Sequence, residues 1–420
     1  MVFGDRSARL AGTPAVPVEL AGPKGRRARS LLRRPLGESL IIRPGMRSRA
    51  RLPRRIRAGL FAGVAGLLSF TAARLAPAAT ERLYAHGLYP ALVGPLSRIT
   101  SRVPFSLAEP VFVAIPLALI ASAAVGYNRR RRGGTRAAAL GEGALRLLGE
   151  AGWIWCAFLI LWGFNYARPD PRELFGLGGT VGADRAPALI ERVGAALDAA
   201  RIASPEDGSG VVAFGRFEDV DRRVRDLQLE ALAEQGWPAI GAPRAKRFLA
   251  SPLLLRWGVS GVYGPFTAEV NVVDPAPPGQ LPFVIAHERA HLAGFAWEEA
   301  ASFVALLTLW RAPEPELRYA GWLAVWLELG RGPKGRTPGV RRDMRAMLDF
   351  FKKHRGREAP VVRRVYSAYL EAHGVRGGTR SYRRVADLAL RYLDRHPWPF
   401  RAPGRSEPRG SAPSPAPGGP

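Results

Sequence analysis

Two histidines and a glutamate make up the segment of this chain with the clearest chemical meaning. His287-Glu288-Arg289-Ala290-His291 matches the pattern H-E-x-x-H. Residues four apart lie on one face of a helix, so both imidazoles can reach one metal ion. The pattern predicts a Zn²⁺ site with His287 and His291 as ligands and Glu288 as the general base that takes a proton from a zinc-activated water. The alternative is two exposed or capping histidines on an ordinary amphipathic helix.

A catalytic zinc ion usually has three protein ligands and one open position. Two acids, Glu298 and Glu299, follow the histidines just after Gly294. In many zinc peptidases a glutamate ligand begins the next helix in an E-x-x-A-D or E-x-x-A-N pattern, whose last residue supports the site. Glu298 fits the ligand position and Ser302 the supporting position, while Glu299 faces another side. Glu299 as the ligand is the alternative, and either acid could simply stabilise a helix N-terminus.

Local signals indicate the elements that position these residues. Pro282 suits the first turn of a helix and Gly294 suits its end. Phe266 to Val273 alternates polar and apolar residues, which predicts a strand, either in the core or at a sheet edge that could pair with a peptide substrate. Further helices are expected as a pair within 184–235, from about Trp297 to Trp310, and over 316–329, 340–354, 360–372 and 381–395.

Three apolar runs precede this region: Ala58 to Ala73, Pro110 to Tyr127 and Ala151 to Tyr166. A membrane span needs about 20 mostly apolar residues, and each run approaches that length with its flanks. The runs therefore predict three transmembrane helices, with buried helices of a large soluble protein as the alternative. No small-residue cleavage site closely follows the first run, so we expect no cleavable signal peptide.

Arginines cluster before the first run and in the segment from Arg129 to Arg146 between the second and third runs. The positive-inside rule places both segments in the cytoplasm, so the chain after Tyr166 is expected on the opposite side. A metallopeptidase with its metal motif inside the bilayer is not expected. The apolar run from Leu281 to Ala286 is too short, and Arg289 interrupts it.

The net charge of +27 comes almost entirely from arginine, and no nucleic-acid-binding motif accompanies it, so a nucleic-acid partner is not expected. Contact with anionic lipid is expected only from a disordered basic arm, residues 1–56. The remaining chain divides into a three-span region, 57–168, a zincin-like domain, 169–400, and a disordered tail, 401–420. Met46 is an alternative start. The lone Cys156 permits neither an intramolecular disulfide nor a zinc site with several thiolates.

Several sequence blocks resemble an uncharacterised bacterial membrane family, domain of unknown function 3810, whose members are regarded as zinc peptidases. The resemblance covers about residues 55–396. Its blocks include Leu161-Trp-Gly-Phe-Asn-Tyr166, Gly261-Val-Tyr-Gly-Pro-Phe-Thr-Ala-Glu-Val-Asn271, Leu281 to His291, Gly294 to Glu298, Val365 to Gly374, and Ser381-Tyr382. One departure is the run Glu298-Glu299-Ala300-Ala301-Ser302, where the family usually has Glu-Asp-Glu-Ala-Asn.

The resemblance implies three N-terminal spans in the bacterial inner membrane and a metallopeptidase-like domain in the periplasm or outside the cell. We therefore expect a mainly α membrane protein with a zincin-like, mostly helical α+β domain and a short strand region before the active-site helix. Its predicted activity is gluzincin-like hydrolysis of a peptide or protein substrate.

Two other functions compete with a peptidase. The first is a catalytically silent zincin-like receptor or scaffold in the cell envelope, although metal binding alone would not need Glu288. The second is a surface that binds anionic envelope polymer in a salt-sensitive manner. Tyr263, His373 and Tyr382 could stabilise an oxyanion, but no pattern places them near the metal, so a structural role is expected for each.

Overall fold

The computed structural model describes residues 52–240, 243–372 and 382–396. Most of the predicted basic arm, Met46, His373 and the tail from residue 401 lie outside these residues. Within them the protein is mainly helical with a small three-stranded sheet, as the predicted class requires.

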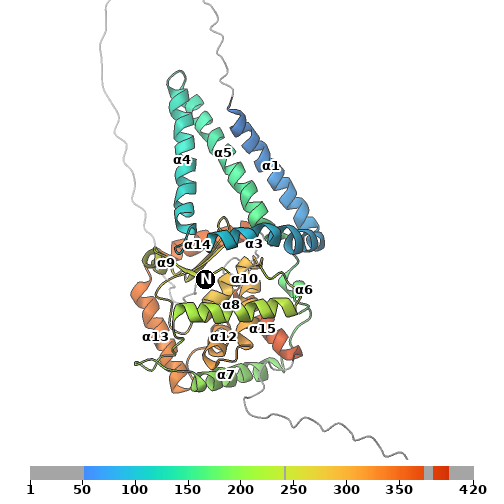
Figure 1. The fold of residues 1–420 in the computed structure, drawn as a ribbon, viewed down its shortest axis with the longest axis vertical. Coiled ribbons are helices and arrows are strands. Elements are labelled where there is room, and N and C mark those ends of the chain that lie inside the picture. The colour runs from blue at the N-terminus through green and yellow to red at the C-terminus, as the bar shows by residue number, and fades with distance from the viewer. Residues whose placement is uncertain (1–51, 241–242, 373–381, 397–420) are drawn as a thin grey trace, which may run out of the picture.

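Three helices are long and apolar enough to cross a membrane, and we call them the span helices: α1 (Arg54–Leu75), α4 (Ala108–Arg131) and α5 (Arg136–Leu161). They project together from one side of a folded domain (Figure 1). Many of their apolar side chains are exposed, for example Phe61 at 74 % and Ile120 at 64 %. Exposed apolar side chains on such long helices fit helices that face lipid.

The third span differs from its prediction. The sequence predicts a span from Ala151 to Tyr166, but α5 begins at Arg136 and ends at Leu161, and the 3₁₀ helix η2 (Gly163–Ala167) follows it. Thr135 caps α5 by accepting a hydrogen bond from the backbone of Ala138. The predicted basic loop therefore shrinks to residues 132–135, and Arg146 lies buried within α5, 3.1 Å from Glu142.

Most other arginines of the span helices gather at one end of these helices, and Arg74 in the last turn of α1 is the exception. Arg54, Arg55 and Arg57 begin α1, while Arg129 to Arg131 end α4 and Arg136 begins α5. This end is the one farther from the folded domain (Figure 1). The basic ends and the domain thus lie at opposite ends of the helices.

Close packing of α1 against α5 depends on glycine. A Cβ atom at Gly152 would lie 2.0 Å from the carbonyl oxygen of Gly59, and one at Gly59 would lie 2.0 Å from that of Gly149. Small residues allow this close approach of two backbones, which membrane helices commonly use to associate.

Short helices lie between the span helices and the domain (Figure 1). They are α2 (Pro77–Ala79), the π-helix η1 (Thr80–Leu88) and α3 (Tyr89–Thr100). Tyr89 and Val93 are fully buried, so this layer belongs to the same hydrophobic core as the domain below it.

Nearly all predicted helices of the domain are present within a few residues of their expected ends. The histidines lie on α10, and the neighbouring α11 follows Trp297, as predicted. The domain contains α6 (Pro171–Leu174), α7 (Ala186–Ala203), α8 (Phe217–Glu234), α9 (Ser251–Trp257), α10 (Leu281–Leu292), α11 (Glu298–Trp310), α12 (Pro315–Glu328), α13 (Pro338–His354), α14 (Ala359–Ala372) and α15 (Tyr382–Arg395).

The sheet differs from the prediction in the position of its strands. It has the order β1-β3-β2, in which β1 (Lys246–Arg247) pairs parallel and β2 (Gly261–Gly264) antiparallel with β3 (Glu269–Val272). The predicted strand from Phe266 to Val273 is therefore shorter, because its first residues form the turn between β2 and β3. The sequence allowed this strand to lie in the core or at an edge, and β3 is the central, buried strand. The edge strand nearer the metal motif is β2.

A buried ion pair joins the domain to the span helices. Lys246 on β1 pairs with Glu269 on β3, and Glu269 also accepts a 2.8 Å hydrogen bond from the backbone of Ala108, the first residue of α4. The Lys246 ammonium donates to the carbonyl oxygens of Thr100 and Phe105, each at 2.9 Å. These bonds fix the end of α4 against the sheet.

We expect Gly152→Val to force α1 and α5 apart, because its side chain would overlap the backbone of Gly59. Overpacking of this kind costs about 1–3 kcal/mol or more. The melting temperature of the detergent-solubilised full chain should fall by several degrees. Gly141→Val is the control on the same helix, since a Cβ there meets no atom within 4 Å. Equal losses in both variants would contradict the glycine contact.

Candidate metal centre

The helix α10 carries both histidines through the interior of the domain. Eleven of its residues are buried, and Pro282 lies in its first turn. The helix ends as predicted, because Gly294 adopts a φ of +91° and the backbone N–H of Phe295 returns to the carbonyl of Ala290 at 3.1 Å. The turn brings the start of α11 back beside the histidines.

Three side chains converge at this turn. The Nε2 atoms of His287 and His291 are 3.1 Å apart, and the Glu298 carboxylate lies 3.3 Å from the first and 3.7 Å from the second. One ligand atom from each residue lies within 4.8 Å of the other two, and all three residues are buried. Two imidazoles and one carboxylate are a ligand set of catalytic zinc sites, so these residues fit a zinc ion.

The opposite ring nitrogens are hydrogen-bonded in a way that leaves both Nε2 lone pairs directed inward. His291 Nδ1 lies 2.8 Å from the carbonyl oxygen of Phe295, which can only accept, so Nδ1 carries the proton. His287 Nδ1 lies 3.1 Å from Ser302 Oγ, which can accept in the same way. Ser302 thus occupies the predicted supporting position, and such partners orient histidine ligands in metal sites.

Burial and mutual contact set the pKa values of the three converging side chains. It lowers the pKa of both imidazoles, which favours their neutral, ligating form. Burial alone would raise the pKa of Glu298, but the close approach of His287 and His291 lowers it well below its usual value. Each residue therefore favours the protonation state that a metal ligand requires.

Glu288 lies beside the ligands but contacts β2. A Cβ at Gly261 would be 2.7 Å from Glu288 Oε1, so the carboxylate packs against the bare backbone of that strand. The backbone of Tyr263 also hydrogen-bonds the carboxylate. Burial raises the pKa of Glu288, as suits a general base that must exchange a proton near neutral pH.

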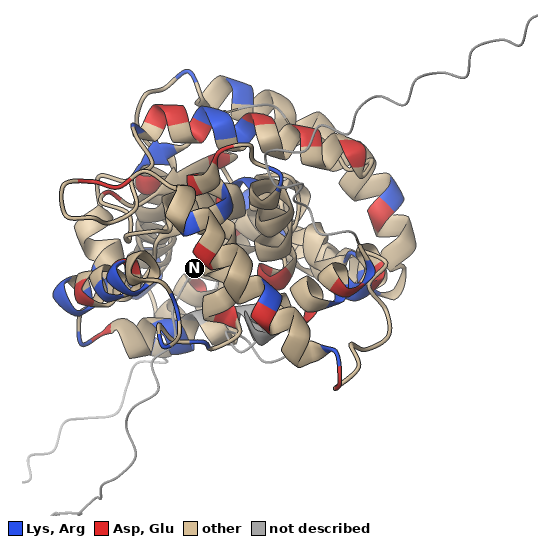
Figure 2. Cartoon of the chain, turned by 90° about the horizontal axis from the view of Figure 1, so that it is seen from below, with Lys and Arg blue, Asp and Glu red and all other residues tan. Residues whose placement is uncertain are grey.

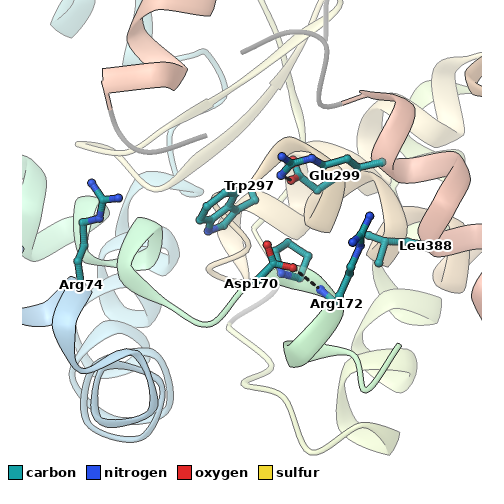
Figure 3. A pocket seen from close by; sticks show the side chains of 8 residues that line it. Arg74, Asp170, Arg172, Trp297, Glu299 and Leu388 are labelled. Carbon is teal, nitrogen blue, oxygen red and sulfur yellow. Dashed lines mark hydrogen bonds and ion pairs between the residues drawn. The ribbon is translucent and has the colours of Figure 1, made fainter. Parts of the chain in front are cut away.

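Glu299 is separated from the histidines. Its carboxylate lies 3.1 Å from Arg384 on α15. Together with Trp297 and Arg172, Glu299 lines a cavity of about 430 Å³ (Figure 3). The geometry therefore groups Glu298, and not Glu299, with the two histidines.

Sequence reasoning missed part of the surroundings. Tyr263 lines the same cavity as Glu288, and its ring lies 4.7 Å from that of Trp162. Its hydroxyl is 3.3 Å from that of Tyr89. Both Tyr263 and Trp162 belong to blocks that carry the family resemblance, which was the available signal. Tyr382 begins α15, a helix that packs against α11.

Comparison with known proteins gives one match. The family described as protein of unknown function (DUF3810) matches residues 84–390, which include the candidate metal centre and the span helices α4 and α5 but not α1. A search of curated proteins and a search of solved structures each found no match.

Glu298→Gln and Glu299→Gln form a matched pair that tests the third ligand. We expect Glu298→Gln to lower zinc affinity by at least about tenfold, the loss that even an outer partner of a ligand can cause. Glu299→Gln should retain the zinc content of the wild type, because its partner is Arg384. Zinc is measured by mass spectrometry after dialysis against a competing chelator. The reverse order of losses would contradict Glu298 as the ligand.

Proposed function

This chain belongs to the DUF3810 family, and from that premise we propose that it is a membrane-anchored, zinc-dependent peptidase. One observation carries the proposal: in the buried cluster of His287, His291 and Glu298, the last two residues share a cavity with Glu288, a carboxylate that does not belong to the cluster. A metal site that only stabilises a fold needs no such additional base.

His287, His291 and Glu298 would hold the ion. A bound zinc ion supplies Lewis acidity, which acidifies a water molecule and polarises the scissile carbonyl. Glu288 accepts the proton of the attacking water and passes it to the leaving amine. Its raised pKa supports both transfers, because the carboxylate binds the proton readily and still releases it.

The edge strand β2 supports a peptide as the substrate. It lies beside Glu288, and in the described residues it pairs only with β3. An extended peptide can add to such an edge through main-chain hydrogen bonds, with its scissile bond held beside the base. This role belongs to β2 rather than to the segment from Phe266 to Val273, where the sequence suggested it.

The arginines support the location of the site. Apart from Arg74 and Arg146, the arginines of the span helices occupy the ends farther from the domain, and the positive-inside rule assigns those ends to the cytoplasm. We therefore place the metal centre outside the cytoplasm, on the outer face of the bacterial inner membrane. The helices of the domain carry acidic and basic residues interspersed (Figure 2), which favours the peptidase over a polymer-binding basic surface.

Replacement of Glu288 by glutamine tests the peptidase. The side chain keeps its size but cannot accept the proton, so we expect kcat for a peptide library to fall by about 10²–10⁴-fold while bound zinc stays at the wild-type level. The full chain in detergent is assayed for both. Zinc without cleavage in the wild type would favour the silent scaffold, and equal cleavage by the variant would contradict the role of Glu288.

Gly261→Ala tests the position of the base without altering it chemically. The added Cβ would overlap Glu288 Oε1 and displace the carboxylate. We expect kcat to fall by about tenfold or more with zinc retained, because small displacements of catalytic groups are costly. Gly178→Ala is the control, since a Cβ there meets no atom within 4 Å. Wild-type kcat in Gly261→Ala would show that β2 does not position the base.

A further inference from the structure

A large apolar cavity extends from the metal centre toward the span helices. Its volume is about 770 Å³, within the usual range for small-molecule sites. Glu288, His291 and Glu298 line its polar end, beside the edge strand β2. The rest of its wall includes apolar side chains of α4 and α5. These two helices lie close together at the ends far from the domain and separate toward it (Figure 1).

The cavity reaches deep along both span helices. On α4 its wall includes Phe112 and Leu119, and on α5 it includes Ala151 and Ile154. At 1.5 Å per residue, Leu119 is about 16 Å from the start of α4 and Ala151 about 15 Å from the end of α5. The hydrocarbon core of a bilayer is about 30 Å thick, so the cavity extends to roughly its middle.

The residues of the cavity wall at this depth determine which kind of apolar molecule can bind there. Phe112, Leu119, Ala151 and Ile154 have no side-chain hydrogen-bonding group, so an extended peptide there would leave its backbone unsatisfied. A helix satisfies its own backbone, but with its side chains it is at least about 10 Å wide. A hydrocarbon chain has no polar groups to satisfy and is much thinner than a helix.

We propose that the α4–α5 cavity binds the acyl chain of a lipid-modified peptide whose peptide part lies at the metal centre. The proposal rests on the proposed peptidase function and names its substrate class. The acyl chain enters from the bilayer between α4 and α5, and the adjoining peptide reaches β2 and Glu288 at the polar end. Because the chain leaves one apolar medium for another, the cavity contributes orientation of the scissile bond rather than a large hydrophobic gain.

Photolabelling tests the binding step without turnover. The probe is a short peptide bearing a palmitoyl chain with a diazirine, added to full-length Glu288→Gln protein in lipid nanodiscs. We expect labelling of the α4 and α5 segments that line the cavity, and its loss when Leu119→Trp or Ala151→Phe fills the space. Leu117→Trp and Leu148→Phe are the controls, since both side chains are more than half exposed and lie outside the cavity wall.

Cleavage tests the consequence for catalysis. With otherwise wild-type protein, we compare kcat/KM for the palmitoylated peptide with that for the same peptide lacking the chain. We expect this ratio to fall by about tenfold or more in Leu119→Trp and Ala151→Phe relative to their controls. Membrane partitioning of the probe is the same for every variant, so it does not enter the comparison. Zinc content and melting temperature identify any variant that fails to fold.

The outcomes separate this inference from the proposed function. Absent cavity labelling, or labelling equal in filled and control variants, would overturn the acyl-chain site, as would an unchanged kcat/KM ratio. Peptide cleavage combined with either result would leave the peptidase standing. Cavity labelling without cleavage of any peptide would support the acyl-chain site and contradict the peptidase.

Discussion

Burial of the polar residues of α10 is the constraint on which the rest of the structure depends. A turn and a half of α10 carries His287, Glu288, Arg289 and His291 into the protein interior, where each polar group needs a partner. Arg289 pairs with Asp221 on α8 and donates to the carbonyl of Pro243 at 2.8 Å. Breaking a buried pair of this kind typically costs about 3–5 kcal/mol.

The other partners of α10 come from the layer of short helices next to the span helices. Tyr89 donates to the carbonyl of Leu292 at 3.0 Å, near the end of the helix. Arg168 donates to the carbonyl of Gly294 at 2.7 Å and to Glu81 on η1 at 2.6 and 2.7 Å. The turn that brings Glu298 to the histidines is therefore held by elements beside the span helices. The candidate metal centre likewise lies on a cavity whose wall includes residues of the span helices α4 and α5.

The sequence predicted what depends on short-range patterns. Spacing placed His287 and His291 on one helical face, Gly294 ended the helix, and the next-helix pattern indicated Glu298 and Ser302. These features depend on residues within about fifteen positions of one another. The apolar runs likewise indicated the span helices, although the start of α5 was missed because its first turns contain charged residues and glycines.

Features that depend on distant contacts could not be predicted. Strand β3 is central because β1 pairs with it, and that two-residue strand has no sequence signal of its own. The contact between Gly261 and Glu288 requires the packing of β2 on α10. The cavity depends on the separation of α4 and α5, which the bond between Glu269 and the start of α4 helps to fix. Each of these links residues far apart in the chain.

X-ray absorption spectroscopy at the zinc edge of the purified full chain tests the central claim most directly. The account predicts one zinc ion per chain, with two imidazole nitrogens and carboxylate oxygen among its ligands and no sulfur, since the only thiol is Cys156. It also predicts that the His287→Ala and His291→Ala double variant loses this signal. Absence of zinc at neutral pH, or the same spectrum from the double variant, would contradict it.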